Sequence, residues 1–238
     1  LKDNVLLVRV SDWNGNSSSI KFKIKANDSI SSRQSYNGIE ILTDQKYTLN
    51  KNSSIIEIDK NTFYNDLLMN VSYQSGILNL GKEKDPFRSS IKIKLPHKIS
   101  DTLELRQSFV GKIINGKIGY INSKKSNSYI YASISSLGEY VISKDSLKPE
   151  IKPINFKSNS NIKLKNTLRL RLKDDLSGIK KYSSYFNGNW ALFEYEPKSN
   201  MIFHNLSDGI IKKGENELII KYEDGVGNKG VYQTKVYY

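Results

Sequence analysis

The sequence predicts an all-β protein made of tandem β-sandwich modules. Short apolar runs recur along the chain between clusters of Asn, Gly, Ser and Asp, a spacing typical of sandwiches and barrels. No long stretch shows the helical apolar period. In several runs a basic residue alternates with an aliphatic one, which places the bases on the solvent face of a strand and the aliphatics on its core face. These runs are Ile20–Lys25, Ile91–Leu95, Ile162–Lys165 and Leu168–Leu172.

Composition excludes several classes of function. There is no cysteine, which removes disulfides, thiol nucleophiles and thiolate metal sites, and no apolar run is long enough for a membrane span. The net charge of +13 favours polyanionic surroundings such as nucleic acid, acidic glycans or anionic envelope polymers. The bases are spread over separate strands, however, so solvated strand faces are favoured over a dedicated polyanion site. No nucleic-acid motif is present, and we expect no nucleic-acid partner.

An internal repeat marks the two ends of the chain. A strand, an Asp-x-x-Gly-Asn turn and a second strand occur at 5–24 and again at 217–236. Gly and Asn accept positive φ, and Asp bonds its own downstream amides, so each copy is predicted to be a hairpin. The first copy is interpreted as the last hairpin of an immunoglobulin-like (Ig-like) module whose earlier strands are missing. Leu1 in place of a start Met and the absence of a signal peptide fit a fragment.

Two connectors set the predicted module boundaries. Ala26–Ser32 is polar, and Ser143–Pro153 contains two prolines that favour an extended linker. The sequence therefore predicts three parts: a terminal hairpin at 1–29, a β-sandwich at 30–145 and a second sandwich at 146–238.

Candidate catalytic groups are few. His97 and Asp101 have the His-x-x-x-Asp spacing of some zinc hydrolases, but catalytic zinc usually has three protein ligands and no third one follows. His97 is therefore predicted to be a loop histidine and His204 a strand histidine. We expect no catalytic residue, no metal-binding histidine and no cofactor in this chain.

Oxygen-rich turns provide a candidate calcium site. Asp174, Asp175, Asp224 and Asn228 lie in two predicted loops, and loops at one end of a sandwich can hold this hard cation. Ordinary turn chemistry explains the same residues and is the favoured alternative.

Aromatic residues provide a candidate ligand surface. Tyr182, Tyr185 and Trp190 flank Asn187-Gly188, a strong signal for a two-residue hairpin. Pairing would set Tyr185 beside Trp190 and Tyr182 near Phe193 on opposite faces. An exposed pair can stack on sugar rings, but packing of Trp190 in the core is the favoured alternative.

Three groups of motifs together resemble the C-terminal region of secreted M23-type (lysostaphin-like) zinc peptidases of Bacteroidetes. The Val10–Asn16 turn resembles the end of an Ig-like module. Ile55–Asp66 and Leu137–Val141 are similar to the opening and closing strands of a ZU5-like sandwich. A third group of segments resembles the last Ig-like module of that family. These segments are Asp174–Ile179, Asn187–Trp190, Phe193–Tyr195 and Asp224–Asn228.

The resemblance implies an upstream catalytic domain in the same polypeptide that hydrolyses peptidoglycan cross-links through zinc. Its zinc ligands have no counterpart here, because His97 and Asp101 lack the family's intervening Gly and lie in the ZU5-like part. We therefore expect a non-enzymatic accessory region of an exported peptidase, in the periplasm or at the cell surface. The alternative is a carbohydrate-binding or adhesive module of a cell-surface protein.

Overall fold

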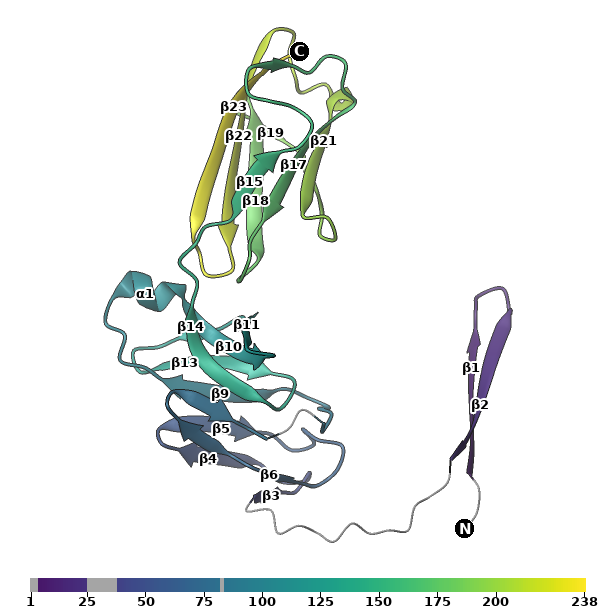
Figure 1. Cartoon of the computed structure of the whole chain (residues 1–238), viewed down its shortest axis with the longest axis vertical. Coiled ribbons are helices and arrows are strands. Elements are labelled where there is room, and N and C mark those ends of the chain that lie inside the picture. The colour runs from purple at the N-terminus through teal and green to yellow at the C-terminus, as the bar shows by residue number, and fades with distance from the viewer. Residues whose placement is uncertain (1–3, 25–37, 82–83) are drawn as a thin grey trace. The chain divides into compact units, whose positions relative to one another are not determined.

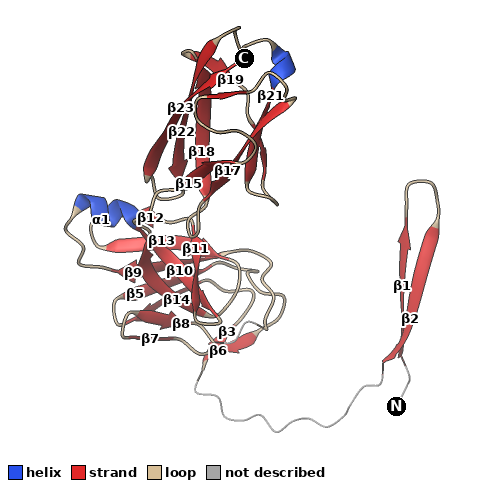
Figure 2. Ribbon diagram, turned by 45° about the horizontal axis from the view of Figure 1, so that its top comes forward, coloured by secondary structure: helices blue, strands red, loops and turns tan. Residues whose placement is uncertain are grey.

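The computed structural model describes residues 4–24, 38–81 and 84–238. The chain divides into two compact units, Leu1–Asn37 and Gly38–Tyr238 (Figure 1). Almost every element is a β-strand (Figure 2), which confirms the all-β class. The predicted connector Ala26–Ser32 and the last residue of the first basic run, Lys25, lie outside the described residues. None of the described helices has the length and apolarity needed to cross a bilayer.

The first unit contains the predicted hairpin. Strands β1 (Asn4–Ser11) and β2 (Ser17–Ile24) pair antiparallel from Asn4 opposite Ile24 to Ser11 opposite Ser17. The turn is held by Asp12, whose Oδ1 accepts hydrogen bonds of 2.9 Å from the N–H groups of Asn14 and Asn16. The Asn16 side chain donates to Asp12 Oδ2 at 2.8 Å. The Asp and Asn of the motif therefore close the turn, as the sequence predicted.

Strand alternation gathers apolar side chains on one face of this hairpin. All of them are exposed, by 41% to 68%: Leu6, Val8, Val10, Ile20, Phe22 and Ile24. The opposite face carries Arg9, Lys21 and Lys23 together with the exposed Val5 and Leu7.

The first sandwich of the second unit has two five-stranded sheets. One has the order β11 (Lys117–Ile121), β10 (Ser108–Ile114), β14 (Glu139–Lys144), β8 (Ile77–Asn79), β7 (Ser72–Gln74). The other has the order β12 (Lys124–Lys125), β13 (Tyr129–Ile134), β9 (Ile91–Pro96), β5 (Ser54–Ile58), β4 (Tyr47–Lys51). A separate pair is formed by β3 (Ile39–Ile41) and β6 (Leu67–Met69).

The core of this sandwich follows the predicted alternation. In β9, Ile91, Ile93 and Leu95 are completely buried, whereas Lys92 and Lys94 face outward and form ion pairs with Glu57 of β5. Both sheets contribute to one apolar cluster, so their inner faces pack against each other. The segment Ile55–Asp66, which was expected to open the module, begins in β5. It is not the first strand of the module, because β3 and β4 precede β5 in the chain. The predicted closing strand is β14.

The only α-helix of the described residues, α1 (Thr102–Gln107), follows β9 and begins after Asp101. The Asp101 Oδ1 accepts a 2.6 Å hydrogen bond from the N–H of Glu104, which is the usual role of an N-cap carboxylate.

The second sandwich pairs a four-stranded sheet with a five-stranded one. The first has the order β15 (Glu150–Pro153), β17 (Thr167–Lys173), β21 (Met201–Asn205), β20 (Glu194–Glu196). The second has the order β16 (Ser160–Asn161), β23 (Lys229–Tyr237), β22 (Glu215–Asp224), β18 (Ile179–Phe186), β19 (Asn189–Ala191). A 3-10 turn, η1 (Leu206–Asp208), follows β21. One cluster of buried side chains from both sheets forms its core.

The two basic runs of this sandwich fold differently. Leu168–Leu172 lies in β17 with its leucines buried and its arginines exposed, as predicted. Ile162–Lys165 is not a strand: the Lys165 N–H donates to Ile162 O at 2.9 Å, and Leu164 is 99% exposed. The Asn161 side chain accepts from the N–H of Lys163 at 2.9 Å, and this local bond favours a turn over a sheet ladder.

The second copy of the repeat is the β22–β23 hairpin, and its turn has the same side-chain bonds as the first. Asp224 Oδ1 accepts from the N–H of Val226 and Asn228, at 3.0 and 2.8 Å, and Asn228 Nδ2 donates to Asp224 Oδ2 at 2.7 Å. Asp12 and Asn16 make the corresponding bonds in the first hairpin. The difference between the copies is burial, because the inner face of β22 is packed in the sandwich core.

The Asn228 side chain also joins the two sandwiches. Its Nδ2 lies 2.9 Å from Asp145 O and 3.1 Å from Leu147 O in the linker. Its Oδ1 accepts a buried 2.7 Å hydrogen bond from Gln107 Nε2 in α1. A further bond runs from the Tyr120 hydroxyl to Gly225 O at 3.2 Å. The turn of the last hairpin is therefore bound to the preceding sandwich by side-chain hydrogen bonds.

Candidate functional site

The β18–β19 hairpin positions the predicted aromatic residues. Asn187 and Gly188 form its turn with φ values of 50° and 81°, the left-handed conformations that a two-residue hairpin needs. Tyr185 is paired directly with Trp190 across the ladder. This confirms the predicted hairpin and the predicted pairing.

Trp190 is 60% exposed, so the favoured expectation that it packs in the core was wrong. The adjacent Ala191 and the nearby Phe193 take the core positions instead, with exposures of 1% and 2%. Because neighbouring residues of a strand point to opposite faces, burial of Ala191 directs Trp190 outward. Tyr185, its partner, is half-buried on the same outer face.

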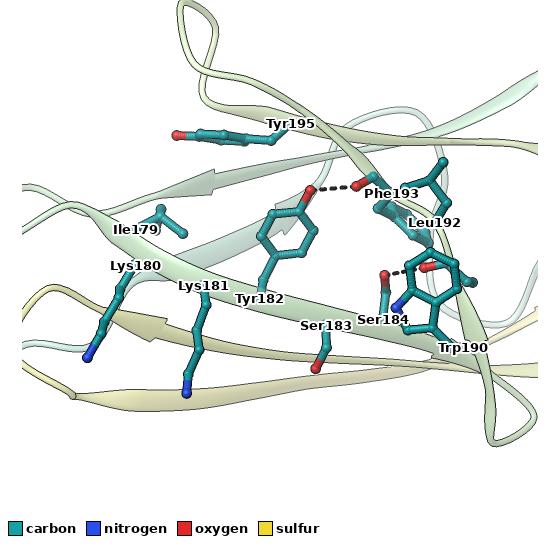
Figure 3. A pocket seen from close by; sticks show the side chains of 11 residues that line it. Ile179, Lys180, Lys181, Tyr182, Ser183, Ser184, Trp190, Leu192, Phe193 and Tyr195 are labelled. Carbon is teal, nitrogen blue, oxygen red and sulfur yellow. Dashed lines mark hydrogen bonds between the residues drawn. The ribbon is translucent and has the colours of Figure 1, made fainter.

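Tyr182 does not belong to that face. Figure 3 shows its ring on the opposite side of β18 from Lys181 and Ser183. Its hydroxyl donates to Phe193 O at 2.5 Å, and burial raises the pKa of the phenol, with smaller contributions from Tyr195 and Glu194. The structure therefore keeps Tyr185 and Trp190 together and assigns Tyr182 to the sandwich edge.

A hollow of about 370 Å³ lies along this edge of β18 (Figure 3). Its walls combine apolar rings with hydroxyl and ammonium groups, from Lys181, Tyr182, Ser183, Trp190, Leu192 and Tyr195. A second hollow of about 370 Å³ lies on the outer face across β18, β22 and β23, and includes Lys181, Lys221 and Val231.

Most of the lysines beside this face are paired with one carboxylate. Glu223 has the Nζ atoms of Lys180, Lys181 and Lys229 at 3.4, 3.3 and 3.9 Å. Burial by itself raises the pKa of Glu223, but hydrogen bonds from Lys181 and Lys180 outweigh it and hold the pKa below its ordinary value. Lys221 differs, because its Nζ lies 5.7 Å from the centre of the Tyr185 ring.

The predicted oxygen-rich loops do meet, with one residue that the sequence did not indicate. Carboxylate oxygens of Asp145, Asp174 and Asp224 all lie within 4.8 Å of one another. Asp145 and Asp224 are 4% and 0% exposed. Asp145 was missed because it lies in the linker, and only the tertiary fold brings it to the two loops.

These carboxylates already accept backbone hydrogen bonds. Asp174 Oδ2 accepts from the N–H of Leu176 and Gly178 at 3.0 and 2.8 Å, and Asp145 Oδ2 accepts from Ser177 at 3.2 Å. Burial raises the pKa of Asp174; the two N–H bonds lower it, and Asp145 and Asp224 raise it further. An all-oxygen set of this kind suits calcium, and calcium binding stays a hypothesis beside ordinary turn chemistry.

The other two residues of the calcium hypothesis lie in different settings. Asp175 faces solvent and forms an ion pair with Lys173, so it is not part of the cluster. Asn228 lies beside the cluster, with its amide bonded to Asp224 and to the linker.

Both histidines have structural contacts. His97 Nδ1 accepts from the N–H of Ile99 at 3.1 Å, and Nε2 lies 2.9 Å from Ser126 O. His204 is completely buried, with Nδ1 2.8 Å from Leu192 O and its ring stacked on Phe193 at 5.0 Å. A zinc ion on either ring nitrogen of His97 would displace one of its two contacts. Nε2 of His204 has no hydrogen-bond partner among the described residues and lies 3.3 Å from Asp208 Oδ1.

Comparison with known proteins agrees with part of this organisation. Residues 41–145 match a family described as the Zu5-like domain, which confirms the ZU5-like part of the resemblance. None of the curated proteins matches the chain.

Two solved structures share limited similarity. The endo-beta-1,4-mannanase from Thermotoga petrophila is 17% identical over 39% of this chain, with a TM-score of 0.33, and the chain spans 20% of its length. The fibronectin(III)-like modules of CbhA from Clostridium thermocellum are 13% identical over 63% of this chain and 85% of their own, with a TM-score of 0.29.

Proposed function

We propose that this chain is a non-catalytic accessory region of an exported cell-wall metallopeptidase. Its sandwiches hold a catalytic domain of the same polypeptide against peptidoglycan, in the periplasm or at the cell surface. The Zu5-like match over 41–145 and the order of the motifs support this proposal.

The observation that carries the proposal is the junction between the sandwiches. A module that positions an enzyme has to maintain an orientation along the chain, and freely jointed domains cannot do this. Here the buried bond between Gln107 and Asn228, together with the Tyr120–Gly225 bond, ties one sandwich to the next.

The first test uses the chain alone. We expect no release of dye from labelled peptidoglycan and no stoichiometric zinc by elemental analysis. Turnover that disappears in the His97→Ala variant, or one zinc per chain, would overturn the non-catalytic assignment.

The second test uses the full-length protein. Asn228→Ala, which removes the junction bonds of the Asn228 side chain, is expected to slow hydrolysis of insoluble peptidoglycan several-fold and to leave cleavage of a small soluble peptide unchanged. Asn16→Ala removes the same turn bonds from the exposed hairpin and serves as the control. Equal rates of wild type and Asn228→Ala on insoluble substrate would contradict a positioning role.

A second candidate function is carbohydrate binding or adhesion. The observation that favours it is the 60% exposure of Trp190 beside Tyr185, since Trp and Tyr are enriched where proteins contact other molecules.

A further inference from the structure

The outer face of the β16-β23-β22-β18-β19 sheet has an ordered row of side chains. Tyr185 is paired with Trp190 on one side and with Ile219 on the other, and Ile219 is paired with Gln233. Residues directly opposite in a ladder share a face. Trp190, Tyr185 and Ile219 therefore form a row of two aromatic residues and one aliphatic residue across three strands, which we call the outer row.

The neighbouring positions on the same face form a second line. Lys221 is paired with Ser183 in β18 and with Val231 in β23, one pleat away from Tyr185 and Ile219. Val231 is 58% exposed, and the Lys221 ammonium reaches back over the Tyr185 ring. A cation thus lies beside the outer row, next to its Tyr185 ring.

The outer row is not used by the core of the sandwich. The inward positions of the same strands are Phe186, Leu218 and Ile220, all completely buried. Exposing an indole costs free energy in proportion to its apolar area, and a ligand with a flat apolar face would recover it. A pyranose ring has such a face beside its polar hydroxyl groups, because the C–H groups on one side of the ring carry partial positive charge and meet the negative face of an aromatic ring.

Charge complementarity identifies the kind of sugar. Lys180, Lys181 and Lys229 share Glu223, whereas Lys221 has no ion pair among the residues that the structure describes. The Lys221 ammonium, beside a sugar ring stacked on the aromatic residues, favours a negatively charged substituent on that sugar. The net charge of the whole chain is +13, and a positive net charge attracts polyanions.

We infer that the outer row and Lys221 bind a polysaccharide whose pyranose rings carry carboxylates. Trp190 and Tyr185 stack on successive rings, and Lys221 pairs with a carboxylate. The inference rests on the proposed carbohydrate-binding function and does not depend on the link to a peptidase.

The test begins with tryptophan fluorescence. The chain has two tryptophans, Trp13 and Trp190, so the Trp13→Phe variant reports on Trp190 alone. Titration with polygalacturonate is expected to shift its emission to the blue and to saturate. An unchanged spectrum would overturn the inference.

Calorimetry with tetragalacturonate then assigns the residues. Trp190→Ala is expected to weaken binding about tenfold or more. Trp13→Ala is the matched control, because Trp13 is 102% exposed and lies in the other unit. Unchanged melting of Trp190→Ala shows that it remains folded. Equal affinity of Trp190→Ala and wild type would contradict the site.

The role of charge has its own control. Lys221→Ala is expected to weaken binding two- to fivefold, roughly the size of an exposed charge pair. Lys198→Ala, at an exposed lysine in the turn between β20 and β21, is expected to have no effect. Higher salt should weaken wild-type binding.

Three other ligands separate the alternatives. Polyglutamate has carboxylates without rings, hydroxyethyl cellulose has rings without carboxylates, and single-stranded DNA has phosphates with bases. Binding as tight as tetragalacturonate by any of them would overturn the inference. Loss of polygalacturonate binding would leave the positioning role intact, because that role is measured by the Asn228→Ala experiment.

Discussion

His204 is a titratable residue that serves as part of an aromatic core. Its ring lies 5.2 Å from that of Phe186 and 5.0 Å from that of Phe193, and Nε2 is 3.3 Å from Asp208 Oδ1 without forming a hydrogen bond among the described residues. Trp190, a larger apolar residue, is exposed. Residue type alone therefore does not tell which side chains of this sandwich are packed in the core and which are exposed.

Removing the His204 ring is expected to destabilise the second sandwich. His204→Ala leaves a cavity between two phenylalanines, and we expect a loss of about 2–4 kcal/mol in the free energy of unfolding. His204→Phe keeps the ring and loses only the bond to Leu192 O, so about 1 kcal/mol is expected. Chemical denaturation measures both; a smaller loss for the alanine variant than for the phenylalanine variant would contradict this account.

Asp174 gives a pH dependence with a defined sign. Its pKa is raised in the folded state, so the folded state holds the proton more tightly than the unfolded chain. The stabilisation from this proton is present below the unfolded pKa of 3.8 and is lost as the pH rises through the higher folded pKa.

Asp174→Asn removes the ionisable group, so stability is no longer lost as the pH rises. The side-chain oxygen of the asparagine can still accept the two backbone N–H bonds. We expect its melting temperature to exceed that of wild type by a few degrees at pH 7, roughly the effect of 1 kcal/mol in a domain of this size, and the gap to close at acid pH. Asp175→Asn, at the exposed neighbour, is the control. If wild type melts higher on addition of calcium and Asp174→Asn does not, the cluster binds the cation, and ordinary turn chemistry, the alternative that the sequence favoured, does not explain these residues by itself.

At the level of elements, the two hairpins show how much the sequence determines locally. The Asp-x-x-Gly-Asn motif was enough to predict both turns, because their bonds run between residues a few positions apart. The alternation of Ile91–Leu95 predicted a strand for the same reason. Ile162–Lys165 shows the limit, since four alternating residues fit a strand equally well and one Asx bond from Asn161 made them a turn.

Gly230 tests the packing of the second hairpin. A Cβ at this position would lie 2.2 Å from Tyr222 Cε2, so the tyrosine ring covers the glycine across the ladder. Gly230→Ala is expected to cost about 1–3 kcal/mol. Ser18 is the residue of the exposed first hairpin that corresponds to Gly230. Ser18→Ala should change the free energy of unfolding by less than about 0.5 kcal/mol. Thermal unfolding of both variants decides the matter; equal stability of Gly230→Ala and wild type would exclude the tight contact.

At the scale of the whole molecule, sequence patterns predicted the parts and not their contacts. The two sandwiches, the hairpin at Asn187-Gly188 and the Tyr185–Trp190 pair follow from short-range rules. The meeting of Asp145 with Asp174 and Asp224, and the bond from Gln107 to Asn228, join segments far apart in the chain. The side to which Trp190 points was predicted wrongly, because both faces of β18 carry aromatic residues and the pattern does not distinguish them.

The junction predicts coupled unfolding of the two sandwiches. Asn228→Ala leaves the buried Gln107 amide without its partner, and we expect a cost on the order of 2–4 kcal/mol and separation of one calorimetric transition into two. Trypsin is expected to cleave faster after Lys144, the last residue of β14. Asn16→Ala should change neither quantity, and a single unshifted transition for Asn228→Ala would argue against coupling.

The contacts of the linker also decide where the protein can be cut for recombinant expression. The predicted border after residue 145 separates Asp145 from its hydrogen-bond partners in the last sandwich. Asn228 donates to the backbone oxygen of Asp145, and the N–H of Ser177 donates to its carboxylate. A clone of the last sandwich that starts at residue 146 would leave those donors facing water. A clone that starts a few residues earlier keeps Asp145 and these hydrogen bonds. We therefore expect it to give the more stable protein for crystallisation and ligand screening.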